Sequence, residues 1–342
     1  MIQQKSYKTT FFLLLILLAV LWFLNISLGS VSIPFSDVFA SIFNGEVSKD
    51  TYRNIIVDYR IPKAITAILV GSGLSISGLL MQTLFRNPLA GPFVLGISSG
   101  ASLGVAILIL GAALIGGISG FVTSSFSMAI AASLGAFLVL SAVLIAANKV
   151  RNTMSILIIG LMFGSITSAI ISVLAYFSSA EQLQQFIFWG FGSLGNLSWN
   201  ELKIFTLIFV IGVSLLFFII KPLNSMLLGE NYAKSMGVNI KKTRYIVLIT
   251  TSILTGVITA FSGPIAFVGL AVPHLTKLIF NTSNHKILLF AVAIVGAILM
   301  LVADMVAQLP TSEYTLPINA ITSLFGAPIV IWLLIRKRKI FI

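Results

Sequence analysis

The sequence predicts an all-α polytopic membrane protein with about ten transmembrane helices, and three observations support this. Of the 342 residues, 58% are hydrophobic and 9% are charged, whereas soluble domains carry about 25% charged residues. Several long runs contain no Asp, Glu, Lys or Arg. Two apolar stretches, 71–101 and 261–277, contain glycine and proline, as is typical of helices that pack closely or break around a pathway.

The charge-free runs define the expected spans. A helix needs about 20 apolar residues to cross the hydrocarbon core, so the run 87–148 must cross more than once, with a break at 111–120. The first run, after Lys5 and Lys8, could instead be a signal peptide, but no small-x-small cleavage site follows. The expected spans, all in one domain of residues 1–342, are 11–29, 61–83, 93–111, 121–147, 153–177, 199–220, 243–261, 265–280, 286–304 and 317–335.

The basic residues predict the orientation of these spans. With both termini in the cytoplasm, the outside segments hold few of the 21 basic residues, and basic residues favour the cytoplasmic side. The net charge of +12 is therefore interpreted as an orientation signal. Nucleic-acid binding is disfavoured, because no basic face with aromatic side chains accompanies the charge. The basic residues expected outside are Lys49, Arg53, Arg60, Lys63 and Lys203.

The residues that are absent narrow the function. There is no cysteine and no Gly-x4-Gly-Lys-Ser/Thr phosphate loop, so we expect this chain to bind no metal, ATP or other cofactor. Spans one to eight and span ten contain no internal carboxylate, and Asp304 lies at the outer end of the ninth. Ion- or proton-coupled secondary transporters usually keep an ionisable group at mid-membrane. Such a carrier and a membrane enzyme remain alternatives, and an energy source outside this polypeptide is favoured.

An ordered set of sequence blocks resembles the membrane permease subunits of type II ABC importers, the iron-siderophore, haem and vitamin B12 permease family. The match runs from Arg60 to the C-terminus. The blocks are Arg60-Ile-Pro-Lys63, Gly78-x3-Gln82-x3-Arg86-Asn-Pro-Leu-Ala90, Leu95-Gly96, Gly100-Ala101, Trp189-x2-Gly-Ser-Leu194, Leu228-Gly-Glu-x2-Ala233-x2-Met236-Gly237, Gly263-Pro-Ile-x-Phe-Val-Gly-Leu-x2-Pro-His274 and Gly326-Ala-Pro328.

The resemblance implies a transport subunit without enzymatic activity in the bacterial cytoplasmic membrane. Ten helices are expected, with spans 2–5 and 7–10 related by an inverted repeat. A second permease subunit would complete a homodimer, with the pathway between the subunits. ATPase subunits would bind ATP and Mg on the cytoplasmic face, and a substrate-binding protein would deliver cargo outside. Ferric siderophores are the expected cargo, with haem and vitamin B12 as alternatives.

The long inside loop, residues 221–242, is the expected ATPase-coupling segment. Gly229 allows a tight turn, and Glu230 favours the N-terminus of the following helix. Ala233 and Gly237, four apart, would leave a smooth face for close contact. An ordinary amphipathic loop is the alternative. The coupling residues implied by the resemblance are Leu228, Gly229, Glu230, Ala233, Met236 and Gly237.

Arg60 and Lys63 are the expected docking residues for the binding protein. They lie three apart at the outer start of the second span, where Pro62 fits the first helical turn, so both charges could face outside. Snorkelling at the interface is the alternative. The family usually has an arginine four residues after the span-nine aspartate, and this chain has Gln308 there. Thr315 and Asn319 also depart from the family pattern.

Two further groups of residues have predicted roles. The turn Asn152-Thr153-Met154-Ser155 joins spans four and five, and the resemblance implies a cytoplasmic gate there. A capped helix start, with Asn152 or Thr153 as the N-cap, is an equal alternative.

A structural role is expected for the second group, whose polar members could satisfy backbone groups where helices break. Its members are Gln82, Asn87, Pro88, Gly263, Pro264, Pro273 and His274.

Overall fold

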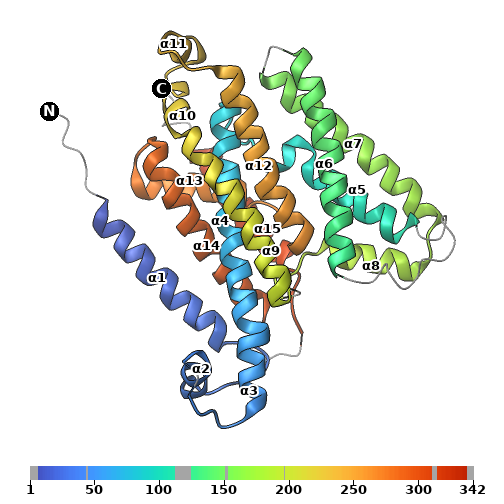
Figure 1. The fold of residues 1–342 in the computed structure, drawn as a ribbon, viewed down its shortest axis with the longest axis vertical. Coiled ribbons are helices and arrows are strands. Elements are labelled where there is room, and N and C mark those ends of the chain that lie inside the picture. Colours follow the sequence, from blue (N-terminus) through green and yellow to red (C-terminus); the bar gives the residue numbers. More distant parts are fainter. Residues whose placement is uncertain are drawn as a thin grey trace.

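The computed structural model describes residues 7–43, 45–111, 125–150, 153–195, 197–309 and 314–336, which form helices and connecting loops without strands (Figure 1). Short π-helical and 3₁₀ segments, Ile55–Arg60, Pro92–Leu95 and Leu215–Phe218, adjoin α4, α5 and α9. The helices are α1 Lys8–Ser27, α2 Phe35–Ile42, α3 Asp50–Asn54, α4 Ile61–Phe85, α5 Ile97–Ile109, α6 Ser125–Lys149, α7 Thr153–Phe177, α8 Ala180–Gly190, α9 Trp199–Ser214, α10 Ile220–Met226, α11 Glu230–Ser235, α12 Ile240–Ser262, α13 Val268–Phe280, α14 His285–Ala307 and α15 Ile318–Arg336.

A helix coincides with each of the ten expected spans, and the all-α membrane class is confirmed. Within the described ranges, seven helical segments are long and apolar enough to cross a bilayer by length and composition. Three shorter apolar helices, α5, α13 and α15, occupy the other expected spans. A helix shorter than the hydrocarbon core leaves backbone polar groups at membrane depth, and neighbouring parts of the protein must satisfy them. The number of crossings and the inverted repeat stay predictions.

Helix α4 is the centre of the bundle. In the apolar window of Asp50–Phe85, 83% of residues are buried, against 17% for Met154–Phe177. α4 packs against α12, α13 and α14 and runs between them (Figure 1). Two glycines permit this approach: a Cβ on Gly71 would overlap the carbonyl of Gly296, and one on Gly78 would overlap the carbonyl of Gly269. Glycine is the residue that lets helix backbones meet so closely.

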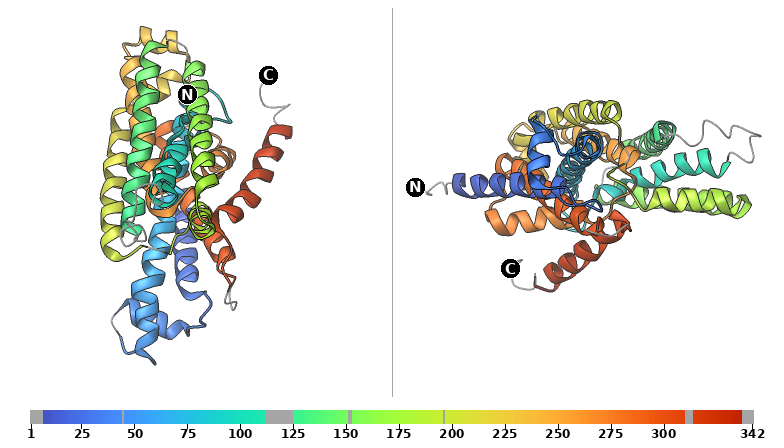
Figure 2. Two further views of the ribbon diagram at one scale, coloured as in Figure 1. Left: turned by 90° about the vertical axis from the view of Figure 1, so that its right-hand side faces the viewer. Right: turned by 90° about the horizontal axis from the view of Figure 1, so that it is seen from below.

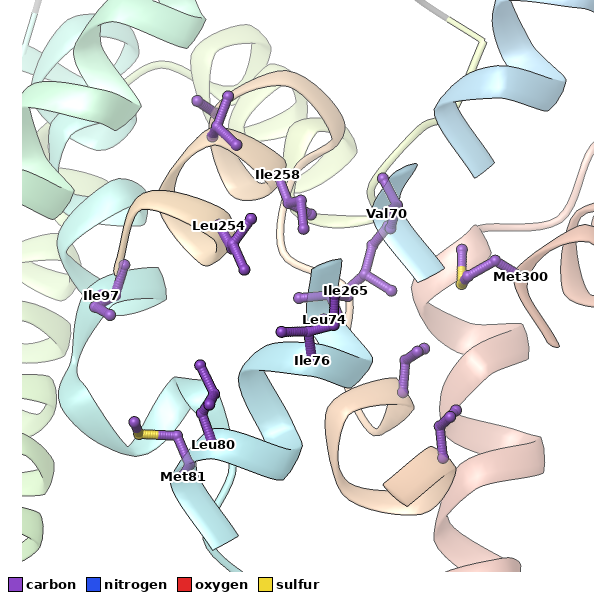
Figure 3. Packing of buried hydrophobic residues seen from close by; sticks show 14 of the residues in the cluster. Val70, Leu74, Ile76, Leu80, Met81, Ile97, Leu254, Ile258, Ile265 and Met300 are labelled. Atoms are coloured by element: carbon purple, nitrogen blue, oxygen red, sulfur yellow. The ribbon is translucent and has the colours of Figure 1, made fainter. Parts of the chain in front are cut away.

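Apolar side chains fill the space around α4. Val70 and Leu74 of α4 are buried together with Ile258 of α12 and Met300 of α14, and Figure 3 shows them converging from these three helices. Because lipid tails are as apolar as these side chains, close packing rather than transfer out of water holds such a core together.

A second group of helices flanks this core. α5 packs against α6 and α7, and α12 contacts both α5 and α6, joining the group to α4. Gly104 lies against the carbonyl of Ala131, so α5 and α6 also meet backbone to backbone. α15 packs against α13 and α14, and its C-terminal end leans away from the bundle (Figure 2).

The bundle has two distinct ends. α2 and α3 lie at one end and α11 lies at the other (Figure 1). α4 follows directly from α3 through the π-helical segment, so it starts near the end predicted to face outside and runs toward the end predicted to face the cytoplasm. The segment between α7 and α9 contains α8, which begins with a capping box between Ser179 and Gln182.

Prediction: Gly78→Ala will destabilise the folded protein, by about 1–3 kcal/mol of unfolding free energy, because the methyl overlaps the Gly269 carbonyl. Gly256→Ala in α12 is the matched control, since a Cβ there meets nothing within 4 Å and alanine favours helix. Thermal unfolding of the two variants in detergent micelles checks this. Equal unfolding temperatures would refute the close contact.

Candidate functional site: an inner apolar patch and an outer charged cluster

The loop between α10 and α12 exposes large apolar side chains. Leu227, Leu228, Tyr232 and Met236 are all exposed, and we call these four residues the inner patch. Basic residues, including Lys234 and Lys241, stand beside it in the chain, as expected of a segment outside the hydrocarbon core. An apolar patch on such a segment is typical of a protein contact surface.

Glycines shape the turns on either side of α11. Gly229 has φ +121° and precedes the helix, and Gly237 has φ +81° and follows it. The N–H of Gly237 bonds to the carbonyl of Lys234 at 2.9 Å, and that of Val238 bonds to Ala233 at 3.0 Å. This pair of bonds is a Schellman cap, which needs a left-handed residue. Gly237 therefore turns the chain from α11 into α12.

Two contacts hold α11 against the bundle. The methyl of Ala233 is 0% exposed, and the carboxylate of Glu230 lies 3.7 Å from the guanidinium of Arg244 in α12. The prediction that Ala233 presents a smooth face to a partner is therefore wrong, because that side chain packs inside the chain. The exposed faces of Leu228 and Met236 provide the contact surface instead.

The inner end of α4 is bonded to this loop. Arg86 caps α4 in the left-handed conformation, with φ 47°. Its Nη2 donates to the carbonyl of Met226 at 2.7 Å. Sequence reasoning placed Arg86 in a family block but assigned it no role, because only the tertiary structure brings α10 to the end of α4.

A polar network joins three helices at the same end. Asn224 of α10 accepts from the backbone N–H of His285 at 2.8 Å, and its Oδ1 lies 3.0 Å from the Nδ1 of that imidazole. The His285 Nε2 lies 2.8 Å from the hydroxyl of Thr83 in α4. Each buried polar group thereby finds a partner. α10, which leads into the inner patch, is fixed to both α4 and α14.

A charged cluster lies at the opposite end, around Asp304 of α14. The carboxylate is 2% exposed and lies 3.1 Å from the Nζ of Lys63 in α4. Asn25 of α1 donates to it at 2.9 Å, and Gln308 donates at 2.6 Å. One cation and two amides compensate the buried charge, as such a charge requires. Gln308 therefore joins this internal network.

Arg60 occupies a different place from the one expected. The residue is 5% exposed, and its guanidinium donates to the carbonyls of Ile26 at 2.9 Å and Ser27 at 2.8 Å. A third bond goes to Val31. The expectation that Arg60 and Lys63 both face outside is wrong for Arg60, because the end of α1 folds over it. The role of these residues in docking stays a prediction.

A cavity opens beside the outer cluster. It has a volume of about 410 Å³ and is lined by Lys63, Asp304, Gln308 and Thr315, among others. Asn319 lies near it in the chain and accepts from the N–H of Ala266 at 3.0 Å. Thr315 and Asn319, which depart from the family pattern as Gln308 does, thus differ from each other: Thr315 lines a cavity, and Asn319 joins α15 to the segment before α13.

The predicted structural residues bring the two glycine- and proline-containing stretches together. Gln82 donates to the carbonyl of Leu270 at 3.2 Å, and His274 bonds to the carbonyl of Pro88 at 2.8 Å. Asn87 accepts from the N–H of Leu89 at 2.9 Å. These bonds satisfy backbone groups where the helices break, as a bilayer requires.

The remaining predicted structural residues shape the 261–277 stretch. Gly263 has φ +72° and ends α12, and Pro264 follows in the irregular segment before α13. Pro273 lies inside α13, where it removes one backbone donor. All three are consistent with a stretch that changes direction inside the bundle.

The predicted gate lies at the start of α7. Thr153 is the first residue of that helix, Met154 is exposed and Ser155 is half-buried. Asn152 lies outside the residues that the structure describes. Neither gating nor capping is tested by these positions, and the gate stays a prediction.

Three curated proteins are similar to this chain over nearly their whole length. The uncharacterized ABC transporter permease protein YvrB of Bacillus subtilis is 36% identical, covering 94% of this chain and 92% of its own. The vitamin B12 import system permease protein BtuC of Klebsiella pneumoniae is 33% identical, covering 98% and 96%. The hemin transport system permease protein HmuU of Yersinia pestis is 33% identical, covering 95% of each.

A solved structure shares the fold. It is described as an inward-facing conformation of a metal-chelate type ABC transporter, with a TM-score of 0.83, 30% identity, and coverage of 96% of this chain and 100% of its own. A model of the FecCD transport family matches residues 17–336. The chain therefore belongs to the FecCD transport family and is a permease of the ABC importer class.

Proposed function

We propose that this chain forms the transmembrane pathway of an ATP-driven importer for ferric siderophores, at the interface with a second, identical permease subunit. The inner patch is the observation that carries the ATP-driven part of the proposal. Four exposed apolar side chains on a loop outside the hydrocarbon core suit a contact with a cytoplasmic ATPase better than contact with water.

The contacts of α4 support a route from the ATPase to the pathway. Its inner end is bonded to α10 through Arg86, and its outer end is bonded to α14 through Lys63. Between these points the helix is buried against α12, α13 and α14. A rigid element that joins both faces can transmit a movement of the loop, provided that it has two stable arrangements.

The cargo is proposed from the kind of relatives that share the fold. The solved structure with 30% identity is described as a metal-chelate type transporter, which favours a ferric siderophore. Relatives for vitamin B12 and for hemin are equally similar at 33% identity, so both cargoes remain the alternatives within the family.

A secondary transporter is the proposal of another class. It would need an ionisable group that binds and releases an ion during transport. Asp304 is a buried carboxylate of the described spans, and Lys63, Asn25 and Gln308 already compensate it. This arrangement favours a static structural charge over a coupling site.

Prediction: proteoliposomes that hold this chain, its ATPase and its binding protein will take up a ferric siderophore only with internal ATP. The measurement is accumulation of labelled ferric siderophore, haem and vitamin B12, each with and without ATP. ATP-dependent uptake of haem or vitamin B12 alone would replace the cargo. Uptake that follows an imposed proton or sodium gradient instead would overturn the proposed function.

Prediction: Met236→Glu will reduce ATP-dependent uptake about tenfold or more, because a carboxylate in the centre of an apolar contact must lose its hydration. Lys241→Ala, an exposed change in the same segment, is the control and should leave uptake nearly unchanged. Copurification of the ATPase is measured in parallel. Full uptake by Met236→Glu with a normally bound ATPase would exclude the inner patch as the coupling surface.

Prediction: Lys63→Met will lower the unfolding temperature, because Asp304 is left buried without its cation. The double variant Lys63→Met with Asp304→Leu removes both charges and should recover most of the lost stability. If Lys63 also docks the binding protein, affinity for that protein will stay low in the double variant. Affinity that returns together with stability would assign Lys63 a structural role alone.

A further inference from the structure

We infer that the groove between α5 and α7 is a cargo subsite selective for uncharged, hydrogen-bonding chelates. The groove has a volume of about 480 Å³, which lies within the usual range for small-molecule pockets. The inference deepens the proposed function, on which it rests, by naming the chemical class of cargo. Serine hydroxyls dominate both walls: Ser98, Ser99 and Ser102 from α5, and Ser168 and Ser172 from α7.

The helical spacing places these serines on facing stripes. Ser98 and Ser102 are four residues apart on α5, and Ser168 and Ser172 are four apart on α7, so each pair shares one face of its helix. α5 and α7 pack against each other. The two stripes therefore line one groove, and a bound molecule would meet hydroxyls from both helices.

One hydroxyl is left without a partner at this place. Ser98 is 7% exposed, and its Oγ makes no hydrogen bond although the atom is buried. A buried unpaired hydroxyl costs folding free energy, which a bound ligand or water can recover. Ser172, by contrast, donates to the carbonyl of Ser168 at 2.9 Å, and its oxygen still has lone pairs that can accept a hydrogen bond. The groove thus offers both donors and acceptors.

Aromatic side chains complete the lining. Phe93, from the 3₁₀ segment before α5, and Phe186, from α8, line the groove together with Ile171. α8 lies at the end of this group of helices away from α11 (Figure 1), which is the side where cargo would arrive. The lining therefore combines five serines with three apolar side chains, and sites for organic ligands typically pair apolar contact surface with placed polar groups.

The lining predicts which chelates fit. It contains no Lys, Arg, Asp or Glu among the described residues that form the groove. An anion placed there would lose hydration without gaining a counter-ion. A neutral ferric trihydroxamate, or the amide-rich surface of vitamin B12, can instead exchange hydrogen bonds with the serines. A triply anionic ferric tris-catecholate, or haem with its two carboxylates, is disfavoured.

The natural chain has no cysteine, so single thiols can report on the groove. Ser102→Cys places a thiol in the lining, and Ser165→Cys places one on α7 at an exposed position that is not part of the lining. The complete importer in proteoliposomes, without ATP, is treated with a small maleimide. The modification rate is measured with a neutral ferric trihydroxamate, with a ferric tris-catecholate, and with neither.

We expect the neutral trihydroxamate to slow modification of the Ser102→Cys variant at least threefold and to leave the Ser165→Cys variant unaffected. The tris-catecholate at the same concentration should change neither rate. Ser98→Ala should raise the KM for the neutral chelate about three- to tenfold, the value of one net hydrogen bond, without lowering kcat. Ser165→Ala is its control.

Equal protection by the anionic chelate would overturn the inference, and so would the absence of protection by either chelate. Both results would leave the proposed function intact if the unmodified importer still takes up cargo with ATP. Because protection is measured without ATP, failure of ATP-driven uptake would count against the proposed function alone.

Discussion

The structure depends on the close approach of the α4 backbone to α13 and α14. Gly71 and Gly78 lie against the carbonyls of Gly296 and Gly269, where any side chain would collide. In a bilayer the hydrophobic effect does not drive helices together, so van der Waals packing across such contacts supplies much of the association energy. Burial of α4 on nearly every side then fixes the positions of the helices around it.

α4 is long and buried, and its two ends are bonded to elements at the two opposite faces of the protein. Arg86 connects the inner end to α10 and thereby to the inner patch. Lys63 connects the outer end to Asp304, which also binds Asn25 of α1. These contacts form a continuous physical path between the faces.

The distribution of polar groups separates structural from transport roles. The charges inside the bundle are compensated: Asp304 by a cation and amides, and Arg60 by backbone carbonyls. Many buried serine and threonine hydroxyls donate to carbonyls of their own helices, as Thr66 and Ser252 do. Ser98 is one of several buried hydroxyls without a hydrogen-bond partner, as Ser75 and Thr250 also are, and it stands in a groove whose lining carries no charge. The proposed selection of neutral, hydrogen-bonding cargo rests on that uncharged, serine-rich lining.

The sequence by itself determined the helical membrane class, the position of each long helix and the family, because hydropathy and ordered glycine and proline blocks act through local composition and the thickness of the bilayer. Only the tertiary structure decided how the polar residues are used. Arg60 and Ala233 were expected to face partners and are buried, since the end of α1 and the packing of α11 cover them. The Arg86–Met226 bond and the serine groove likewise join segments far apart in the chain, which no local pattern encodes.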